Sequence, residues 1–423
     1  MKNWKKTKLF EICEVETGYR PSRKETDNTG YFSLGGEHIT EDHQVNYEKN
    51  DWFISKVFFD SLARGNLNQE ATLFVKDGAT IGKCAYFKPS RSQYKCCVNE
   101  HLYKIISKKE LCVNRFLYYI ICSPFYQAMI KNCITGAAQP GLNRTFLSTV
   151  EISLPNINIQ RKIASILSAY DDLIENNLHR IQILEEMAQL IYQEWFVSFR
   201  FPGYEKVKFI DSELGKIPEG WKRSFKDFVD FKEGPGIRSY QYKEKGIPFL
   251  NIRTLSDNDI DFSKVQYVDE EEVNTKYKHF LLEEGDHVVS SSGTLGRIVT
   301  IQDFHLPLML NTSIIRMRPK TNNVGRWQLK HFLKSDYFQN QILSLASGVA
   351  QMNYGPTHLK EMFIFAPNEE IGKEYENIVS PLELTINNLV KKNEILRETR
   401  DLLLPKLISG ELDISDLDIV IRE

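Results

Sequence analysis

The sequence predicts an α+β protein in which two similar globular domains are joined by two long antiparallel helices that form a coiled-coil-like pair. Three observations predict this fold. The stretch Gln160–Phe196 repeats apolar residues at alternating steps of four and three, without proline or glycine. A second stretch of this kind, Ser380–Leu404, lies near the C-terminus. The chain also repeats itself once, at low identity, with a period of about 212 residues, which predicts an internal pseudo-two-fold repeat.

The first long helix is expected to pack along another helix, because its apolar residues form a continuous seam. One position of the seam, Asn177, is polar. The apolar positions are Ile163, Leu167, Tyr170, Ile174, Ile181, Leu184, Ala188, Ile191 and Trp195.

The second long helix has its own start signals. Ser380 is a good N-cap, Pro381 suits the first helical position and Glu383 completes a capping box. Upstream of it, Gly372 predicts an early break. The two helices are natural partners, and we interpret them as a rigid bar that holds two globular domains apart. The apolar side of the second helix carries Leu382, Ile386, Leu389, Leu396 and Leu403.

The internal repeat sets the expected domain boundaries. Asp77–Lys83 is echoed by Ser292–Arg297, and Ser123–Gln127 is echoed by Ser335–Gln339. Each half therefore consists of a globular part followed by a long helix. The boundaries predicted in this way are a globular domain over 1–155, a helical spacer over 156–200, a second globular domain over 201–367, and a helical spacer with a tail over 368–423.

Within each half, short strand-like runs precede one helix, a glycine-rich loop and a last strand that ends at proline. The helix is expected over Asn114–Asn132 in the first half and over Arg326–Leu345 in the second. The last strand is expected over Glu151–Leu154 and over Met362–Phe365. Each globular domain is therefore predicted to be α+β.

The net charge of −2 alone argues against a nucleic-acid partner, but the charges are unevenly distributed. The globular parts are net basic and the helical parts are net acidic. Long solvated helices are often rich in glutamate, which explains the pattern without any ligand. The alternative is that the globular parts contact phosphate.

No secretory signal is expected, because the basic N-terminus lacks an apolar segment, and no apolar run is long enough for a membrane helix. The protein is therefore expected in the cytoplasm, with no membrane partner. The seven cysteines include no C-x-x-C pair, so buried reduced thiols are expected rather than disulfides or a zinc site. The nine histidines are scattered and complete no set of metal ligands.

Catalytic motifs are missing from the sequence. The loop Gly78–Cys84 resembles a phosphate-binding loop, but it has three residues between its glycines where four are needed. It also has cysteine where the magnesium-binding hydroxyl belongs. The chain is therefore predicted not to be an enzyme and to hold no cofactor or metal of its own.

Polar glycine-containing loops are the candidate binding elements. Arginine reads guanine, glutamine and asparagine read adenine, and serine or threonine holds phosphate. Such loops are most often simple turns, but here each kind occurs once in each repeat. The candidate DNA-binding residues are Arg20, Ser22, Arg23, Thr80, Lys83, Gln139, Asn143, Arg144, Arg238, Ser239, Thr294, Arg297, Gln351 and Asn353.

Motifs in and around the helices resemble those of a known family. The whole chain resembles the DNA-specificity subunit of type I restriction-modification systems. The match in the globular domains is architectural, because these vary widely in such families. The motifs that carry the resemblance are Leu154–Pro155, Gln160–Leu167, Asp171–Asn177, Leu184–Gln189, Gly215–Trp221 and Leu403–Leu412.

The resemblance implies two target-recognition domains, each of which reads one half of a bipartite, asymmetric site in double-stranded DNA. It implies that the helix pair fixes the spacing and docks two modification subunits. Catalysis is then expected in the partners: modification subunits that methylate adenine with S-adenosylmethionine, and restriction subunits that use ATP and magnesium. Leu173, Leu178, Leu190, Tyr192 and the tail Ser409–Glu423 are candidates for docking, although packing against the protein's own domains explains the first four equally well.

Two other classes of function stay open at this point. One is an enzyme, a single-chain nuclease or methyltransferase, which would need a catalytic motif that the sequence does not contain. The other is a scaffold whose coiled coil joins two domains that bind other proteins.

Overall fold

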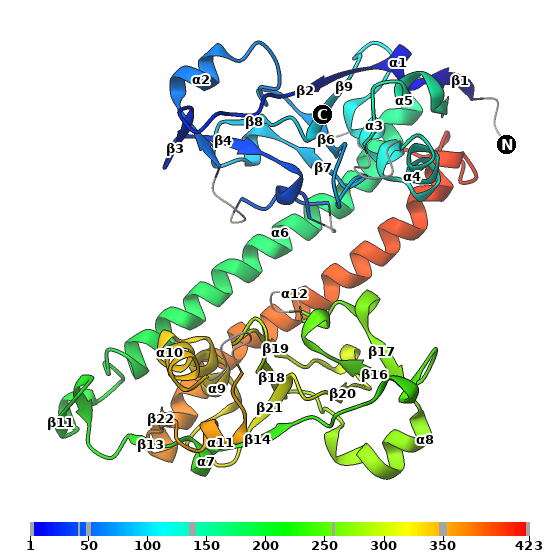
Figure 1. Ribbon diagram of the computed structural model, residues 1–423. Helices are drawn as coiled ribbons and strands as arrows, with labels where there is room; N and C mark the ends of the chain where they lie inside the picture. Colours follow the sequence, from blue (N-terminus) through cyan, green and yellow to red (C-terminus); the bar gives the residue numbers. More distant parts are fainter. Residues whose placement is uncertain are drawn as a thin grey trace. The chain divides into compact units, whose positions relative to one another are not determined.

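The computed structural model describes residues 4–40, 43–47, 52–134, 141–255, 259–346 and 353–419 (Figure 1). The candidates Gln139 and Gln351 lie outside these residues. The chain divides into two compact units. Unit 1 comprises Met1–Glu175 and Glu394–Glu423, and unit 2 comprises Asn176–Asn393. Both units mix helices and sheets. Within the described part of the chain, no helix combines the length and apolar character needed to cross a bilayer.

Unit 1 is built on two four-stranded sheets with the strand orders β2-β9-β6-β7 and β3-β5-β4-β8. All neighbouring strands are antiparallel except the pair β4–β8. A further pair joins β1 to β10. The strands are β1 (Lys5–Lys8), β2 (Cys13–Thr17), β3 (Thr26–Asp27), β4 (Tyr31–Leu34), β5 (Phe53–Ile54), β6 (Ala71–Val75), β7 (Cys84–Phe87), β8 (Cys96–Val98), β9 (Leu102–Ser107) and β10 (Glu151–Leu154). The short helices are α1 (Leu9–Ile12), α2 (Lys56–Ser61), α3 (Asn114–Cys122), α4 (Pro124–Lys131) and α5 (Phe146–Thr149).

The core of unit 1 lies on both faces of β6, in which every residue is buried. The sheet β2-β9-β6-β7 has the longer strands and is called the larger sheet, and β3-β5-β4-β8 is called the smaller sheet. Phe74 of β6 belongs to the apolar cluster that includes most of α3, whereas Leu73 and Val75 belong to a second cluster with the smaller sheet. A strand that is buried on both faces reads as a continuous apolar run rather than as an alternation. This strand therefore joins the two halves of the unit.

Unit 2 repeats this topology. Its sheets have the orders β14-β21-β18-β19 and β15-β17-β16-β20, and β16–β20 is again the parallel pair. The strands are β11 (Phe209–Ser212), β12 (Gly215–Pro218), β13 (Lys222–Ser224), β14 (Val229–Glu233), β15 (Tyr242–Lys243), β16 (Ile247–Leu250), β17 (Gln266–Val268), β18 (His287–Ser290), β19 (Ile298–Thr300), β20 (Met309–Leu310), β21 (Ile314–Pro319) and β22 (Phe363–Phe365). The short α-helices are α7 (Phe225–Phe228), α8 (Glu270–Glu272), α9 (Arg326–Lys334), α10 (Asp336–Leu345) and α11 (Pro356–Leu359); α9 and α10 lie beside the sheet of β18 and β21 (Figure 1). The weak sequence repeat thus corresponds to a repeated strand order.

The single helix expected in each half is in fact two helices. In unit 1 the break falls at Ser123, because a residue before proline is disfavoured in the helical conformation. In unit 2 it falls at Ser335, which is extended and whose hydroxyl accepts a hydrogen bond from the backbone of Phe338. Serine is a preferred N-cap, so it starts a new helix here.

The two long helices are α6 (Ile157–Phe196) and α12 (Glu369–Ser409). Both begin after an asparagine cap. Asn156 Oδ1 accepts from the amide of Ile159 at 3.0 Å, and Asn368 Oδ1 accepts from the amide of Ile371 at 2.9 Å. The expected start of the second helix at Ser380 is therefore wrong.

Gly372 does not break α12, contrary to the expectation from the sequence. It lies inside the helix where the chain passes close to another segment, and a Cβ there would lie 2.5 Å from the carbonyl oxygen of Asn323. Pro381 is also interior, although proline removes a helical hydrogen bond. Tyr375 and Val379, both fully buried just before it, hold this part of the helix against the core.

Both long helices contribute to the core of each unit. In unit 1, Ile163 and Leu167 of α6 share an apolar cluster with Leu404 and Leu407 of α12. In unit 2, Ala188, Tyr192 and Trp195 of α6 share a cluster with Tyr375 and Val379 of α12. Tyr192 is 2% exposed, so it is a core residue and not a docking residue.

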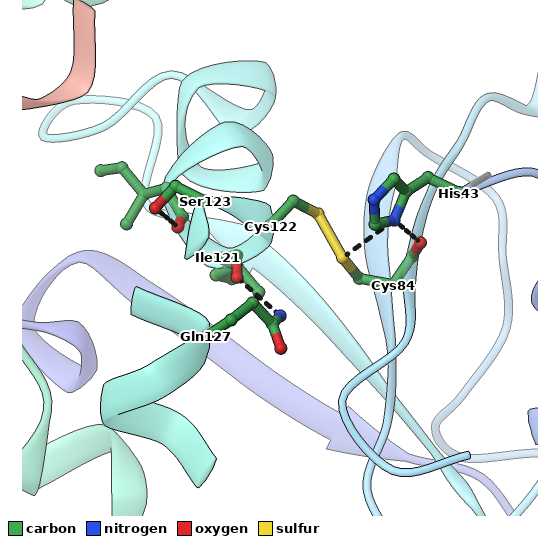
Figure 2. Close-up of a disulfide and its surroundings, with 7 residues drawn as sticks. His43, Cys84, Ile121, Cys122, Ser123 and Gln127 are labelled. Carbon is green, nitrogen blue, oxygen red and sulfur yellow. Dashed lines mark hydrogen bonds between the residues drawn. A yellow bond between two sulfur atoms is a disulfide. The ribbon is translucent and has the colours of Figure 1, made fainter. Parts of the chain in front are cut away.

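The structure contains one disulfide, between Cys84 at the start of β7 and Cys122 at the end of α3 (Figure 2). The expectation that every thiol is reduced is wrong at these two residues. Their Cα atoms lie 6.5 Å apart because α3 packs on the sheet edge formed by β7, a contact that spacing along the sequence does not reveal. Most of the other cysteines are buried, and burial raises the pKa of Cys97 to about 12.

Thiol titration checks this pairing. Ellman's reagent should count two fewer thiols in the denatured, unreduced protein than after reduction, because Cys84 and Cys122 are joined. The variant Cys122→Ser should give the same count before and after reduction. An unchanged count for the wild-type protein would contradict the pairing.

His287 is a buried, neutral histidine in unit 2. Its Nε2 donates to the carbonyl of Arg326 at 2.8 Å, which leaves Nδ1 to accept from the hydroxyl of Thr300 at 2.9 Å. Burial lowers the pKa of His287 to about 3, although the hydrogen bond to Arg326 opposes the shift. Between pH 6.5 and about pH 3, His287 is therefore protonated in the unfolded chain but neutral in the folded chain.

Unit 2 should therefore lose stability as the pH falls from 6.5 towards 3, by up to about 1.4 kcal/mol per pH unit from this group. Urea unfolding followed by tryptophan fluorescence measures it, because Trp195, Trp221 and Trp327 lie in unit 2. In the variant His287→Gln the fall should be shallower. Equal slopes in the two proteins would show that His287 does not carry the effect.

Candidate nucleic-acid interface

In unit 1 the loop after β2 is held against the segment that precedes β9. The amide of Gly18 donates to the carbonyl of Asn99 at 3.2 Å. Only glycine fits at this point, because a Cβ would lie 1.5 Å from the carbonyl oxygen of Val98. Arg20 follows on the exposed side of the loop, with Nε 3.5 Å from Glu100 Oε1. The backbone therefore fixes where this arginine emerges.

The loop after β6 meets the segment that follows the glycine-rich stretch. Asp77 forms a β-bridge with Gly141, and the amide of Leu142 donates to the carbonyl of Lys76 at 2.7 Å. The hydroxyl of Tyr103 donates to the carbonyl of Leu142 at 2.8 Å. Two loops that are far apart in the sequence are thus joined at one end of the larger sheet.

Charged groups connect these loops. The Asp77 carboxylate lies 2.6 Å from His101 Nδ1 and 3.0 Å from Lys76 Nζ. His101 Nε2 lies 3.3 Å from Glu100, which also faces Arg20. Both acidic side chains therefore have cationic or imidazole partners, so they repel an anion less than free carboxylates would.

Unit 2 brings the corresponding loops together. Gly234, after β14, approaches Asn311 so closely that a Cβ would lie 2.6 Å from its backbone. Ser292 forms a β-bridge with Asn353, and the amide of Tyr354 donates to the carbonyl of Ser291 at 3.1 Å. Each unit therefore presents an end of its larger sheet at which three or more polar loops meet.

Most of the predicted residues lie on the surface of these loops. Thr80 and Lys83 are half-buried in the turn between β6 and β7. Gln139 and Gln351 are outside the described residues. The exposed candidates are Arg20, Ser22, Arg23, Asn143, Arg144, Arg238, Ser239, Thr294, Arg297 and Asn353.

Several of these residues also shape the loops. Asn143 Oδ1 accepts from the amide of Thr145 at 2.9 Å, which is a local turn interaction. Arg297 Nη1 donates to the carbonyl of Leu255 at 3.1 Å. The hydrogen bond to Leu255 therefore holds the side chain of Arg297 in place. The amide oxygen of Asn143 is used within its own turn.

The structure also reveals residues that sequence reasoning missed. Asn99 Oδ1 accepts from the amide of His101 at 2.8 Å, and Asn311 Oδ1 accepts from the amide of Ser313 at 2.7 Å. These asparagines occupy equivalent places before β9 and β21, and the repeat in the sequence contained this signal. Arg64, whose guanidinium lies 4.7 Å from the ring centroid of Tyr19, gave no such signal.

One group of side chains within the described residues has the composition of a metal site. It consists of His43, Cys84 and Cys122 (Figure 2). His43 Nδ1 lies 2.9 Å from the carbonyl oxygen of Cys84 and 3.6 Å from its sulfur. A metal needs thiolates, and here the two sulfurs are joined to each other, so this form of the protein does not offer the ligands.

Comparison with known proteins gives a consistent assignment. The family model described as type I restriction modification DNA specificity domain matches residues 1–186 and 218–397. The MjaIX specificity subunit of a type I restriction enzyme from Methanocaldococcus jannaschii is 26% identical, over 98% of this chain and 95% of its own length. The MjaVIII specificity subunit from the same organism is 23% identical, over 83% of this chain and 81% of its own.

A solved structure shares the fold. The crystal structure of the type I restriction-modification system S subunit from M. genitalium superposes with a TM-score of 0.56 at 17% identity, over 98% of this chain and 97% of the other. Two matched segments, each with the same strand order and the same meeting of polar loops, account for most of the length. The chain therefore belongs to the family of type I restriction-modification DNA specificity proteins.

Proposed function

We propose that this chain is the DNA sequence-recognition subunit of a type I restriction-modification complex, in which each unit reads one half of a bipartite site. The observation that carries the proposal is the repeated meeting of polar loops at one end of the larger sheet in each unit. Because the loops differ in sequence between the units, the two half-sites differ and the target is asymmetric.

The target-recognition domains are assigned to 1–155 and 201–367, with helical spacers over 156–200 and 368–423. The loop arginines supply salt-dependent attraction to phosphate, and they read guanine where they reach a base edge. We assign these contacts to the exposed candidates identified above, together with Thr80, Lys83, Gln139 and Gln351. The chain itself performs recognition and carries out no catalysis.

The long helices are proposed to run antiparallel and to fix the spacing between half-sites about a pseudo-two-fold axis. Contacts within unit 2 support this direction. The rings of Trp195 and Tyr375 lie 5.5 Å apart, and Asn177 Nδ2 donates to Asn393 Oδ1 at 2.8 Å. The step back along α6 from Trp195 to Asn177 equals the step forward along α12 from Tyr375 to Asn393. A helix of 40 residues is about 60 Å long, which is one to two turns of B-DNA.

Exposed apolar residues on the long helices are proposed to dock two modification subunits. On α6, Leu173 is 38% exposed in unit 1, and Leu190, 59% exposed, and Met187 are exposed in unit 2. Isolated exposed apolar residues are ordinary, but a series along one helix is typical of a partner contact. S-adenosylmethionine, ATP and magnesium belong to the modification and restriction subunits, and the complex is expected to act in the cytoplasm.

Selection from random duplex DNA tests the proposal. The chain, assembled with its modification subunits, should enrich two short, different sequences separated by a fixed number of unspecified base pairs. Strand cleavage or methyl transfer by the pure chain would favour an enzyme, and the absence of any binding would favour a scaffold.

With Arg144→Ala the sequence of one half-site should relax, and with Arg297→Ala that of the other, each by about 1–3 kcal/mol of discrimination.

The spacing function has a separate test. Four residues inserted after Glu175 in α6 and four after Asn393 in α12 fall at the boundary between the units and leave each unit intact. The insertion lengthens each helix by about 6 Å, so the preferred spacer should grow by roughly two base pairs. A spacer of unchanged length would mean that the helices do not measure it.

A further inference from the structure

A carboxylate on α6 gathers donors from two other helices in unit 1. Asp171 Oδ2 accepts from the hydroxyl of Tyr119 and from Arg115 Nη2, the latter at 3.2 Å; both residues lie on α3. Asp171 Oδ1 accepts from Arg400 Nη1 of α12 at 2.8 Å. The side chains of Asp171, Arg115 and Arg400 are 11%, 13% and 13% exposed. One largely buried anion therefore links α3 of the domain to both long helices.

Aromatic rings fix the position of Arg115, the cation that the globular part of unit 1 contributes to this cluster. The guanidinium of Arg115 lies 4.4 Å from the ring centroid of Tyr86 and 5.7 Å from that of Tyr119. Stacked guanidinium groups are held in orientation as well as in place. Arg115 can therefore meet Asp171 only when α3 has one position along α6.

A carboxylate on α12 is bound by donors from the globular part of unit 2 in a similar way. Glu383 accepts from Lys330 Nζ and from His331 Nε2, the latter at 2.9 Å, and both donors lie on α9. The hydroxyl of Tyr375 donates to His331 Nδ1 at 2.8 Å. Burial alone would raise the pKa of Glu383, but the hydrogen bond from His331 and the charge of Lys330 outweigh it and lower the pKa to about 2.

The two clusters are related by the internal repeat. Asp171 and Glu383 occupy equivalent positions on the two long helices, and Tyr119 and His331 occupy equivalent positions on α3 and α9. The contact between the carboxylate and the second long helix differs between the two units. The position equivalent to Arg400 is Ala188, which is fully buried in the apolar core of unit 2. In unit 1 the carboxylate thus also binds the second long helix, through Arg400.

Apolar packing alone does not impose such a position. The hydrophobic effect is non-directional, whereas a hydrogen-bonded ion cluster loses its partners when the helices shift. Replacing a buried ion cluster with apolar residues is often neutral or stabilising, so stability does not explain why these clusters are present. Their distinctive contribution is geometric.

We infer that Asp171 and Glu383 are positioning residues that fix each recognition domain on the long helices and thereby sharpen the spacer length that the protein accepts. The inference rests on the proposed function for its link to DNA. Its structural part, that Asp171 holds α3 at one position on α6 and α12, stands without DNA.

The test replaces the unit 1 cluster without leaving a buried charge. In the triple variant Asp171→Leu, Arg115→Met and Arg400→Met, the hydroxyl of Tyr119 loses its acceptor, so thermal unfolding should occur at or slightly below the wild-type temperature. The spacer preference, measured by selection with the assembled complex, should broaden so that discrimination between adjacent spacer lengths falls several-fold. If folding fails, Arg400→Met alone keeps Asp171 paired with Arg115 and should give a weaker form of the same broadening.

Matched variants separate positioning from a general charge effect. Lys373 on α12 pairs with Glu369 at 2.7 Å on an exposed surface, so Lys373→Met removes the same charge without touching a cluster and should leave the profile unchanged. Arg400→Lys keeps a cation within reach of Asp171 and should restore most of the discrimination. An unchanged spacer profile in both the triple variant and Arg400→Met overturns the inference.

A measurement without DNA distinguishes failure of the positioning role from failure of the proposed function. Spin labels on genetically encoded residues at Lys131 of α4 and Arg161 of α6 report the position of the domain on its helix within unit 1. The distance distribution should be narrow in the wild-type protein and broad in the triple variant. Broadening without any bipartite DNA site would refute the proposed function and keep the positioning role. An unchanged distribution would refute the positioning role.

Discussion

The structure depends on the burial of both long helices in the core of each unit. Tyr375 of α12 is fully buried among Tyr192, Trp195 and Phe196 of α6, and ring pairs between them have centroids 5.0–6.5 Å apart. In unit 1 the other end of α12 supplies Leu407 to the cluster that contains Leu167 of α6. Unit 1 is complete only with Glu394–Glu423 from the other end of the chain, whereas unit 2 is formed by the continuous segment Asn176–Asn393. The helices are therefore part of each domain's fold, and a change in their geometry is transmitted to the sheets that carry the loops.

The sequence predicted those features that depend on periodicity, and it failed where the cause was a contact between distant segments. The seam of α6 follows from its apolar spacing, and Ile163, Leu167, Ile174, Ala188 and Trp195 are all buried. The start of α12 was misplaced because Ser380 and Pro381 form a good local start signal. Asn368 caps the helix earlier, and the fit of Gly372 against Asn323 becomes visible only when the chain is folded. The Cys84–Cys122 pair was missed for the same reason, since only the packing of α3 on β7 brings the two thiols together.

The loops were predictable as a set, but their individual roles were not. Glycine in a turn indicates either conformational freedom or a close approach, and Gly18 and Gly234 both prove to be close approaches to a neighbouring segment. Asn143 was selected as a reader of adenine, yet its amide oxygen stabilises its own turn. Asn99 and Asn311 were overlooked because a side chain that organises a turn looks the same in sequence as any polar loop residue. The DNA-binding role of the exposed arginines stays a prediction, and it needs only a fixed backbone and access to solvent for a long cation.

The comparison between the units shows which parts of the design are free to diverge. Strand order and the position of the parallel strand pair are the same in both units. The side chains at equivalent positions of the two units differ. Where unit 1 has Cys84 and Cys122, unit 2 has Ile298 at the start of β19 and Lys334 at the end of α9. Where unit 1 ties its carboxylate to Arg400, unit 2 has Ala188. The two units therefore keep one frame while the side-chain contacts that stabilise it differ, and such tolerance of substitution is compatible with the proposed recognition of two unlike sequences.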